Sequence, residues 1–456
     1  MVRAHTWLAL LAALAGLVAP ARGYHDFSDL LPGDYCSQRG CCDNRLDSCS
    51  VPIVGTLCYC DDFCNATSDD CCPDYLSHCR GISVSQPLQR GCYLNNQYYP
   101  HGSLIKINCN ECKCQASGAL PEFLCERHAC LVEPDTLVSV NSQQRRLGWS
   151  AANHTAFWGR RLDEGISLRL GTLFPHNSVR MMNPVRRMFD ASRLPRSFDA
   201  RSQWRGQLQG VSDQGWCGAS WALSMADVVS DRFAIMSEGK ELVRLSAQQL
   251  LSCSRGQRGC EGGYLDRAWM FLWKYGLVNE ECYPYGARGS NLGNCRLPKK
   301  VDLHSSCRHA GPRGPHVPER RTPYHTGPAY RISGEKDIMH EIMVSGPVQA
   351  TMKVYQDFFS YRAGVYQNSH VDDGQRTGYH SVRILGWGEE TLDSGELVKY
   401  WLAANSWGPL WGEGGYFRIR RGNNECEVED FVLAAWAHTY DSLQGLYHPR
   451  QGNRLY

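Results

Sequence analysis

Twenty-three cysteines constrain this 456-residue chain more than any other feature of its sequence. They form three groups: ten between Cys36 and Cys79, six between Cys92 and Cys130, and seven between Cys217 and Cys426. The first two groups have too few apolar residues for an ordinary hydrophobic core, and small secreted modules of this size depend on disulfides. We therefore expect two disulfide-stabilised modules ahead of a larger domain.

The first 23 residues predict the cellular compartment of the chain. Arg3 and His5 precede an apolar run over residues 7–19, and Pro20 follows with small residues. This order is typical of a cleaved secretory signal peptide at residues 1–23, and the run is shorter than the ~20 residues that a membrane span needs. We expect a secreted chain without a membrane span, in a compartment where disulfides persist.

Charge and composition exclude one class of partner. The net charge is +2 with 21% charged residues, which removes the electrostatic case for nucleic acid. We expect no cofactor and no bound metal, because cysteines in a secreted chain pair with each other by default. The alternative metal ligands are Cys58 with Cys60, Cys112 with Cys114, and the set Cys295, His304, Cys307 and His309.

The first cysteine group carries a recognisable pattern. Its second half reads Cys58-x-Cys60-x3-Cys64-x6-Cys71-Cys72 and closes at Cys79, and it resembles a somatomedin B module over residues 32–80. The resemblance implies binding to proteins or matrix without catalysis. That family has eight cysteines, whereas this group has ten. We expect all ten in disulfides: Cys36, Cys41, Cys42, Cys49, Cys58, Cys60, Cys64, Cys71, Cys72 and Cys79.

The second group resembles a short von Willebrand factor C-type module over residues 91–135. The resemblance rests on Gly91-Cys92-Tyr93 and on the run of residues 108–114. Two acceptor triplets, which begin at Asn65 and Asn153, predict N-glycosylation of a secreted glycoprotein.

A cysteine-free stretch over residues 131–216 contains three pairs of basic residues, Arg145-Arg146, Arg160-Arg161 and Arg186-Arg187. A solvated charged face is the commonest reason for such pairs. Proteolytic processing and polyanion binding are the alternatives.

Residues 214–222 carry the pattern for chemistry. After Ser220, the apolar positions Trp221, Met225, Val228, Val229 and Ile235 predict an amphipathic helix. Free N–H groups and the dipole at its N-terminus favour negative charge, and the amide of Gln214 adds a donor. These are the parts of an oxyanion hole with a nucleophile in front of it. Alone, Ser220 could be an ordinary N-cap.

The same residues resemble papain-type cysteine peptidases. Gln214, Cys217 and Trp221 match that family's motif, but the nucleophile position holds Ser220. Residues 378–382 resemble the strand with the family's histidine, here His380, and residues 405–408 resemble the segment with its orienting asparagine, here Asn405. The resemblance implies an α+β papain-like domain over residues 195–440, with a tail at 441–456. A groove would separate a helical half with Ser220 from a β-rich half with His380 and Asn405.

Further residues point to the cathepsin B branch of that family. Residues 246–253 and Gly262-Gly263-Tyr264 match the branch, and residues 149–157 and 170–172 look like its propeptide, which implies a propeptide-like linker at 136–194. The resemblance also implies a Cys217–Cys260 disulfide and an unpaired Cys426. A secreted chain that joins a somatomedin B module to such a domain resembles the tubulointerstitial nephritis antigen family.

The serine decides the expected function. A thiol with a pKa near ~8.5 forms a thiolate beside histidine, whereas a serine hydroxyl needs a base placed to take its proton. We therefore expect a noncatalytic peptidase homologue with Gln214, Ser220, His380 and Asn405 as vestigial residues. Its role would be that of an extracellular matrix or basement-membrane glycoprotein that binds matrix proteins or cell-surface receptors. The alternatives are a scavenger-type receptor module for proteins or polysaccharides, and a weak serine hydrolase that uses Ser220 and His380.

Overall fold

The computed structural model describes most of the chain. The described residues are 33–53, 56–65, 70–82, 91–95, 97–115, 121–286, 292, 294–298, 300–307, 320–371, 374, 376–440 and 442. The predicted signal peptide at 1–23 and all but residue 442 of the predicted tail fall outside them. Within these ranges, none of the helices has the length and apolarity that a membrane span requires. The chain divides into two compact units, residues 1–103 with 113–124, and residues 104–112 with 125–456.

The first cysteine group folds as a small module around its own disulfides. Its elements are α1 (Tyr35–Arg39), β1 (Ser50–Ile53), β2 (Thr56–Tyr59), a short 3-10 turn (Asp62–Asn65) and α2 (Tyr75–Cys79). Four disulfides hold it: Cys36–Cys60, Cys41–Cys79, Cys42–Cys49 and Cys58–Cys72. Ile53 and Tyr75 are the buried apolar side chains among the cysteines, so disulfides replace most of a core here.

The predicted disulfide of Cys64 is wrong. The structure holds Cys64 as a thiol, and the Cys71 sulfur donates a hydrogen bond to the Cys64 carbonyl oxygen at 3.1 Å. A hydrogen bond with the Cys71 side chain, together with burial, raises the pKa of the Cys64 thiol.

The second cysteine group forms two small sheets. Strand β3 (Cys92–Leu94) pairs with β4 (Gln97–Tyr99). The other sheet consists of β5 (Leu104–Ile107), β6 (Asn110–Gln115) and β7 (Glu122–Cys125). The boundary between the two compact units passes through this second sheet. The three disulfides of the group are Cys92–Cys114, Cys109–Cys130 and Cys112–Cys125. They use every cysteine of the group, so the alternative metal site at Cys112 and Cys114 is wrong.

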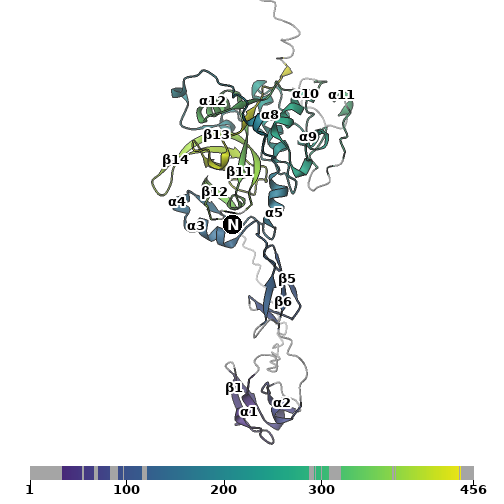
Figure 1. Ribbon diagram of the computed structural model, residues 1–456, viewed down its shortest axis with the longest axis vertical. Coiled ribbons are helices and arrows are strands. Elements are labelled where there is room, and N and C mark those ends of the chain that lie inside the picture. The colour runs from purple at the N-terminus through teal and green to yellow at the C-terminus, as the bar shows by residue number, and fades with distance from the viewer. Residues whose placement is uncertain are drawn as a thin grey trace, which may run out of the picture. The chain divides into compact units, whose positions relative to one another are not determined.

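The rest of the chain forms a helical half and a β-rich half. Figure 1 shows α8, α9 and α10 grouped on one side, with strands β11 to β14 on the other. The main sheet has the order β10-β16-β11-β13-β14-β15-β12-β8, with β9 paired to β13. Each half has its own buried apolar cluster. The predicted α+β, papain-like fold is confirmed.

The bounds of these elements follow chain order. Helices are α3 (Pro134–Ser142), α4 (Gln144–Leu147), α5 (Leu162–Gly165), α6 (Asn177–Arg180), α7 (Ala200–Gln203), α8 (Ser220–Met236), α9 (Ala247–Cys253), α10 (Leu265–Tyr275), α11 (Leu303–Ser306) and α12 (Glu335–Ser345). Strands are β8 (Trp149–Ala151), β9 (Phe198–Asp199), β10 (Tyr330–Ile332), β11 (Val348–Val354), β12 (Tyr361–Tyr366), β13 (Gly378–Thr391), β14 (Leu397–Ala404), β15 (Tyr416–Arg420) and β16 (Val432–Ala434).

Helix α8 is buried on all sides, whereas the spacing of its apolar residues predicted an amphipathic helix. Its polar residues do not face solvent, because they are paired inside the protein. Asp231 accepts from Arg383 at 2.6 Å, and Arg232 donates to Glu341 at 2.9 Å. The charged face that the sequence pattern places in water is therefore an internal contact between the two halves.

The cysteines of this unit settle two expectations. Cys217 pairs with Cys260, as the family resemblance implied, and Cys426 is a buried thiol outside the disulfides of the described residues. Burial raises the pKa of the Cys426 thiol well above its ordinary value, which keeps it unreactive. The four-residue zinc alternative is wrong, because Cys295 pairs with Cys253 and Cys307 with Cys282. Its fourth ligand, His309, lies outside the described residues.

Residues 131–194 belong to the same compact unit as the papain-like residues. Strand β8 adds to the main sheet beside β12, and Trp149, Phe157 and Leu170 lie in the buried cluster of the β-rich half. This stretch therefore contributes to the core of the domain that follows it.

We expect Trp149→Ala to destabilise the whole papain-like unit. Trp149 is 1% exposed and its indole N–H donates to the Gln367 carbonyl oxygen at 2.9 Å. Loss of a buried tryptophan costs about 3–5 kcal/mol, and urea denaturation measures it. Trp158→Ala is the control, because Trp158 is exposed in the same stretch and its loss should cost under about 1 kcal/mol. Equal effects of the two variants would contradict the packing described above.

Candidate functional site

Ser220 is the first residue of α8, and its side chain is completely buried. The N-cap position belongs to Ala219, so the N-cap interpretation of Ser220 is wrong. The approach to the helix is tight: the Gly218 N–H donates to the Cys260 carbonyl oxygen at 2.8 Å, and a Cβ on Gly218 would lie 2.4 Å from that oxygen. Gly218 and the Cys217–Cys260 disulfide therefore set the position of Ser220.

His380 and Asn405 come together as predicted. His380 lies in β13, Asn405 follows the end of β14, and the His380 Nε2–H donates to the Asn405 Oδ1 atom at 2.7 Å. The Trp407 ring covers the pair, 5.1 Å from the imidazole. Burial lowers the pKa of His380 to about 4, so its imidazole is neutral at physiological pH.

The hydroxyl of Ser220 is bound elsewhere. Its oxygen lies 3.0 Å from the Thr172 hydroxyl and accepts the Ser381 backbone N–H at 3.3 Å. Among the described residues, the Nδ1 atom of His380 has no partner with good hydrogen-bond geometry, although a backbone interaction with Leu170 raises the pKa of the imidazole. The hydroxyl therefore pairs with residue 172 of the same chain and lacks the hydrogen bond to a base that serine catalysis requires.

Both polar atoms of the Gln214 side chain are hydrogen-bonded within the protein. Its Nε2 group donates to the Cys217 carbonyl oxygen at 2.8 Å and faces the Leu168 carbonyl oxygen at 3.5 Å. Its Oε1 atom accepts from the Ser406 hydroxyl at 2.7 Å. The amide predicted as an oxyanion donor is thus already hydrogen-bonded in this state.

Residues 171–173 run between the two halves and hydrogen-bond to both. The Thr172 N–H donates to the Tyr379 carbonyl oxygen in the β-rich half at 3.1 Å. On the helical half, the Leu173 N–H donates to the Gly263 carbonyl oxygen and the Gly263 N–H to the Gly171 carbonyl oxygen, both at 2.9 Å. We call residues 168–174 the groove segment, because they occupy the place where the family resemblance implied a groove.

Gly171 is required at its position. Its φ is +94°, and a Cβ there would lie 2.0 Å from the Gly218 carbonyl oxygen. Any side chain would push the groove segment away from the loop that leads to Ser220.

Arg169 holds the first end of the groove segment through two aromatic rings, and Phe174 holds the other end by packing on Tyr379. The Arg169 guanidinium lies over the Phe157 ring at 5.0 Å and the Trp216 ring at 5.4 Å, while its carbonyl oxygen accepts the Trp407 indole N–H at 2.7 Å. The Phe174 ring packs on Tyr379 at 4.4 Å. Sequence reasoning missed Arg169 and the Thr172 hydroxyl, and the available signal was the propeptide likeness of residues 170–172.

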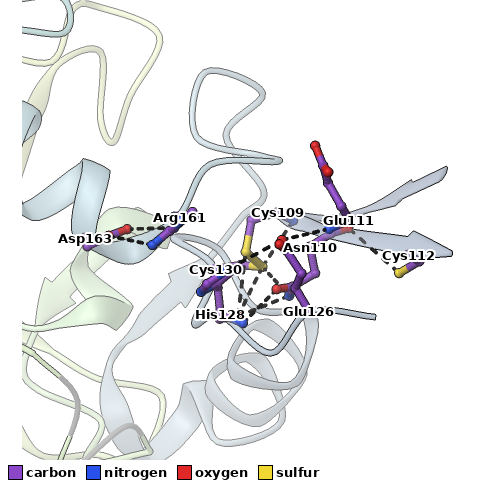
Figure 2. Close-up of polar contacts among 9 residues, drawn as sticks. All are labelled: Cys109, Asn110, Glu111, Cys112, Glu126, His128, Cys130, Arg161 and Asp163. Atoms are coloured by element: carbon purple, nitrogen blue, oxygen red, sulfur yellow. Dashed lines mark hydrogen bonds and ion pairs between the residues drawn. A yellow bond between two sulfur atoms is a disulfide. The ribbon is translucent and has the colours of Figure 1, made fainter. Parts of the chain in front are cut away.

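The chain that leads to the groove segment is connected near Cys130 to the second cysteine group (Figure 2). The Cys109–Cys130 disulfide lies beside Asn110, whose Oδ1 atom accepts the His128 N–H at 2.7 Å and whose Nδ2 group donates to the His128 carbonyl oxygen at 3.1 Å. The backbone of Cys130 in turn forms an isolated antiparallel β-bridge with that of Arg161. A disulfide-fixed turn therefore anchors the chain that leads to the groove segment.

The structure describes the side chain of only one of the two predicted glycosylation sites. Asn153 is exposed just after β8, where a glycan has room. The side chain of Asn65 lies outside the described residues.

Gly171→Ala should release the groove segment. The clash with the Gly218 carbonyl oxygen and the strain at positive φ together predict hydrogen exchange at least about tenfold faster at the Thr172 and Leu173 amides. Exchange followed by mass spectrometry measures this.

Gly159→Ala is the matched control for this release. Gly159 also has a positive φ, +75°, but its added Cβ would find its nearest contact at an ordinary 3.6 Å. Slow exchange at residues 172 and 173 in both variants would show that the segment does not depend on Gly171.

The buried imidazole predicts a pH dependence of stability. Because the folded-state pKa of His380 is about 4 against an ordinary 6.5, only the unfolded chain binds this proton between those values. The free energy of unfolding should therefore fall by about 2–3 kcal/mol from pH 7 to pH 4.5 through this group. Denaturation of His380→Asn should lack this component, whereas His304→Asn, at an exposed histidine, should keep it. Identical pH profiles for all three proteins would contradict it.

Comparisons with known proteins show a papain-family domain and full-length relatives. Residues 194–436 match the family model described as papain family cysteine protease. The chain is 44% identical over 422 residues to "Tubulointerstitial nephritis antigen-like" of Mus musculus, covering 89% of this chain and 88% of that protein. It is 39% identical over 429 residues to "Tubulointerstitial nephritis antigen" of Homo sapiens, covering 91% and 89%.

Among solved structures, procathepsin B S9 from Trypanosoma congolense matches with a TM-score of 0.57 and 30% identity, covering 68% of this chain and all of that chain. The full-length relatives show that the chain belongs to the tubulointerstitial nephritis antigen family, and the family model shows that it contains a papain-family domain.

Proposed function

We propose that this protein is a secreted, noncatalytic peptidase homologue that acts in the extracellular matrix by binding other proteins. The observation that carries the proposal is the hydroxyl of Ser220, which pairs with Thr172 of the same chain at the position of the papain-family nucleophile. The protein would use a peptidase scaffold as a rigid support, with its binding surfaces elsewhere.

The chemistry of the site supports the absence of catalysis. A serine hydroxyl attacks only when a base takes its proton. His380 makes no hydrogen bond to the Ser220 hydroxyl, and it is a weak base because burial lowers its pKa to about 4. The groove segment also excludes a substrate chain, since it uses the Gly263 carbonyl and N–H groups that line the groove. Two independent obstacles thus oppose hydrolysis.

Separate observations support an extracellular location for the protein. The predicted signal peptide, the exposed Asn153 acceptor and ten disulfides among the described residues all suit the secretory pathway. Because the groove is filled, we assign binding of matrix proteins or cell-surface receptors to the two cysteine-rich groups, the first of which resembles a somatomedin B module.

A weak serine hydrolase is the second candidate. The short contact between His380 and Asn405 favours it, because this contact would orient an imidazole base. Hydrolysis would require that the groove segment leave and that Ser220 turn toward the imidazole.

The test uses full-length protein purified from the medium of secreting cells. Wild type and Ser220→Ala should hydrolyse fluorogenic peptides equally poorly, and neither should react with a fluorophosphonate probe. The same two proteins in the Gly171→Ala background, where the groove is open, should also be inactive, which separates a missing nucleophile from a blocked groove. Hydrolysis or labelling that depends on Ser220 in either background would favour the hydrolase.

The matrix role has its own measurement. The secreted protein should be enriched in the detergent-insoluble matrix that the cells deposit, and Ser220→Ala should be enriched to the same degree. Recovery of wild type only from the soluble medium would contradict the matrix assignment without bearing on catalysis.

A further inference from the structure

Two of the exposed tyrosines of this protein are neighbours. Among the tyrosines of the described residues, only Tyr93, Tyr98 and Tyr275 are exposed to solvent, with exposed fractions of 63%, 45% and 60%. The first two lie directly opposite each other in the hairpin of β3 and β4, where Tyr93 pairs with Tyr98. Residues opposite each other in an antiparallel pair have their side chains on the same face, so the two phenols share one surface.

The two rings are held in contact on that surface. Their centroids lie 5.3 Å apart and their planes are inclined by 57°. The Tyr98 ring also lies against the backbone of Gly91, where an added Cβ would come within 2.4 Å of it. Tyr99 belongs to the opposite face, because successive residues of a strand alternate, and its ring packs on Phe123 at 5.5 Å. The hairpin therefore presents one pair of phenols to solvent.

The cysteines around the hairpin cannot act as reductants. Cys92 is bonded to Cys114, and the other four cysteines of the second group form Cys109–Cys130 and Cys112–Cys125. A thiol next to an oxidised phenol would return an electron to it, whereas a disulfide does not. A radical formed on either tyrosine would therefore meet the other phenol before it met a thiol of this group.

Contact between the rings favours one reaction. A phenol that loses an electron and a proton becomes a tyrosyl radical, and two such radicals join through the carbons next to their hydroxyl-bearing carbons. Neighbouring rings replace a rare encounter between two molecules with a step inside one molecule. The terminal torsion of a tyrosine side chain has a broad energy well, so the two rings can turn these carbons toward each other.

We propose that Tyr93 and Tyr98 are the site of an oxidative cross-link, a dityrosine bond formed by an extracellular haem peroxidase. The peroxidase reduces one hydrogen peroxide to two waters and takes one electron and one proton from each phenol. A carbon–carbon bond forms between the rings, and the hydrogen on each newly bonded carbon moves to the oxygen of its ring. Both rings are phenols again, and the protein has lost two hydrogen atoms.

The cross-link would stabilise a short hairpin. Strands β3 and β4 have three residues each, and an isolated two-stranded ribbon is marginally stable in water. The Cys92–Cys114 disulfide joins β3 to β6, whereas the new bond would join β3 to β4. This inference goes beyond the proposed function, because the coupling requires neither matrix binding nor an inactive site at Ser220.

The test treats purified full-length protein with a purified haem peroxidase and an equimolar amount of hydrogen peroxide. The monomer, isolated by size exclusion, should acquire the fluorescence of dityrosine. Trypsin should release residues 91–106 as one peptide, because they follow Arg90 and end at Lys106. After reduction of its disulfide, this peptide should be lighter by two hydrogen atoms, and tandem mass spectrometry should find no backbone fragments between residues 93 and 98.

Three variants serve as controls for the site. Tyr93→Phe and Tyr98→Phe keep the ring packing but remove a phenol, so each should lower dityrosine in the monomer at least about tenfold. Tyr275→Phe is the matched control, because Tyr275 is about as exposed as Tyr93 but has Phe271 as its ring neighbour at 5.1 Å. Its monomer should contain as much dityrosine as wild type. Elution of each variant with wild type shows that it has folded.

Three results would overturn the assignment. They are equal dityrosine in the monomers of all four proteins, a bond that maps to Tyr99, and dityrosine confined to dimers. A wild-type monomer that stays unmodified under conditions that couple free tyrosine would overturn it too. These measurements involve neither matrix nor peptide substrate, so such a failure would leave the proposed function unaffected.

Discussion

The hydrogen bonds of residues 171–173 with both halves of the papain-like domain are the interaction on which the rest of the structure depends. These three residues satisfy backbone groups of Gly263 and Tyr379 that would otherwise face an open groove. They also place the Thr172 hydroxyl at 3.0 Å from Ser220. A glycine at 171 makes this approach possible, because the Gly218 carbonyl oxygen leaves no space for a Cβ.

The segment and the serine reinforce each other chemically. A thiolate at position 220 would form an ion pair with a protonated histidine, and that pair would need water or a charged partner. The neutral hydroxyl instead fits a buried site in which His380 is uncharged and Thr172 supplies a hydrogen-bond partner. In the function that we propose, the serine replaces the usual nucleophile, and its neutral hydroxyl can be buried without an ionic partner. A peptidase fold can then serve as a stable support, with residues 131–194 inside its core.

Local motifs predicted more of the site than of its surroundings. His380, Asn405 and the Cys217–Cys260 disulfide could be predicted from short patterns that resemble the papain family, and the free Cys426 was implied by the same resemblance. The α+β architecture could be predicted for the same reason.

What the sequence could not predict depends on contacts between distant residues. The spacing of apolar residues in α8 indicates an exposed face, but Arg383, more than 100 residues away, covers Asp231. The contact of Thr172 with Ser220, and that of Arg169 with Trp216, likewise join residues more than 40 positions apart. Cys64 differs for another reason, since a count of cysteines shows which could pair but not which have been oxidised.

The central claim is that the chain's own groove segment occupies the site at Ser220. A high-resolution crystal structure of the protein purified from culture medium tests this most directly. Continuous density for residues 168–174, with the Thr172 hydroxyl within hydrogen-bond distance of Ser220, is the predicted result. An open groove, with His380 hydrogen-bonded to the Ser220 hydroxyl, would contradict the account.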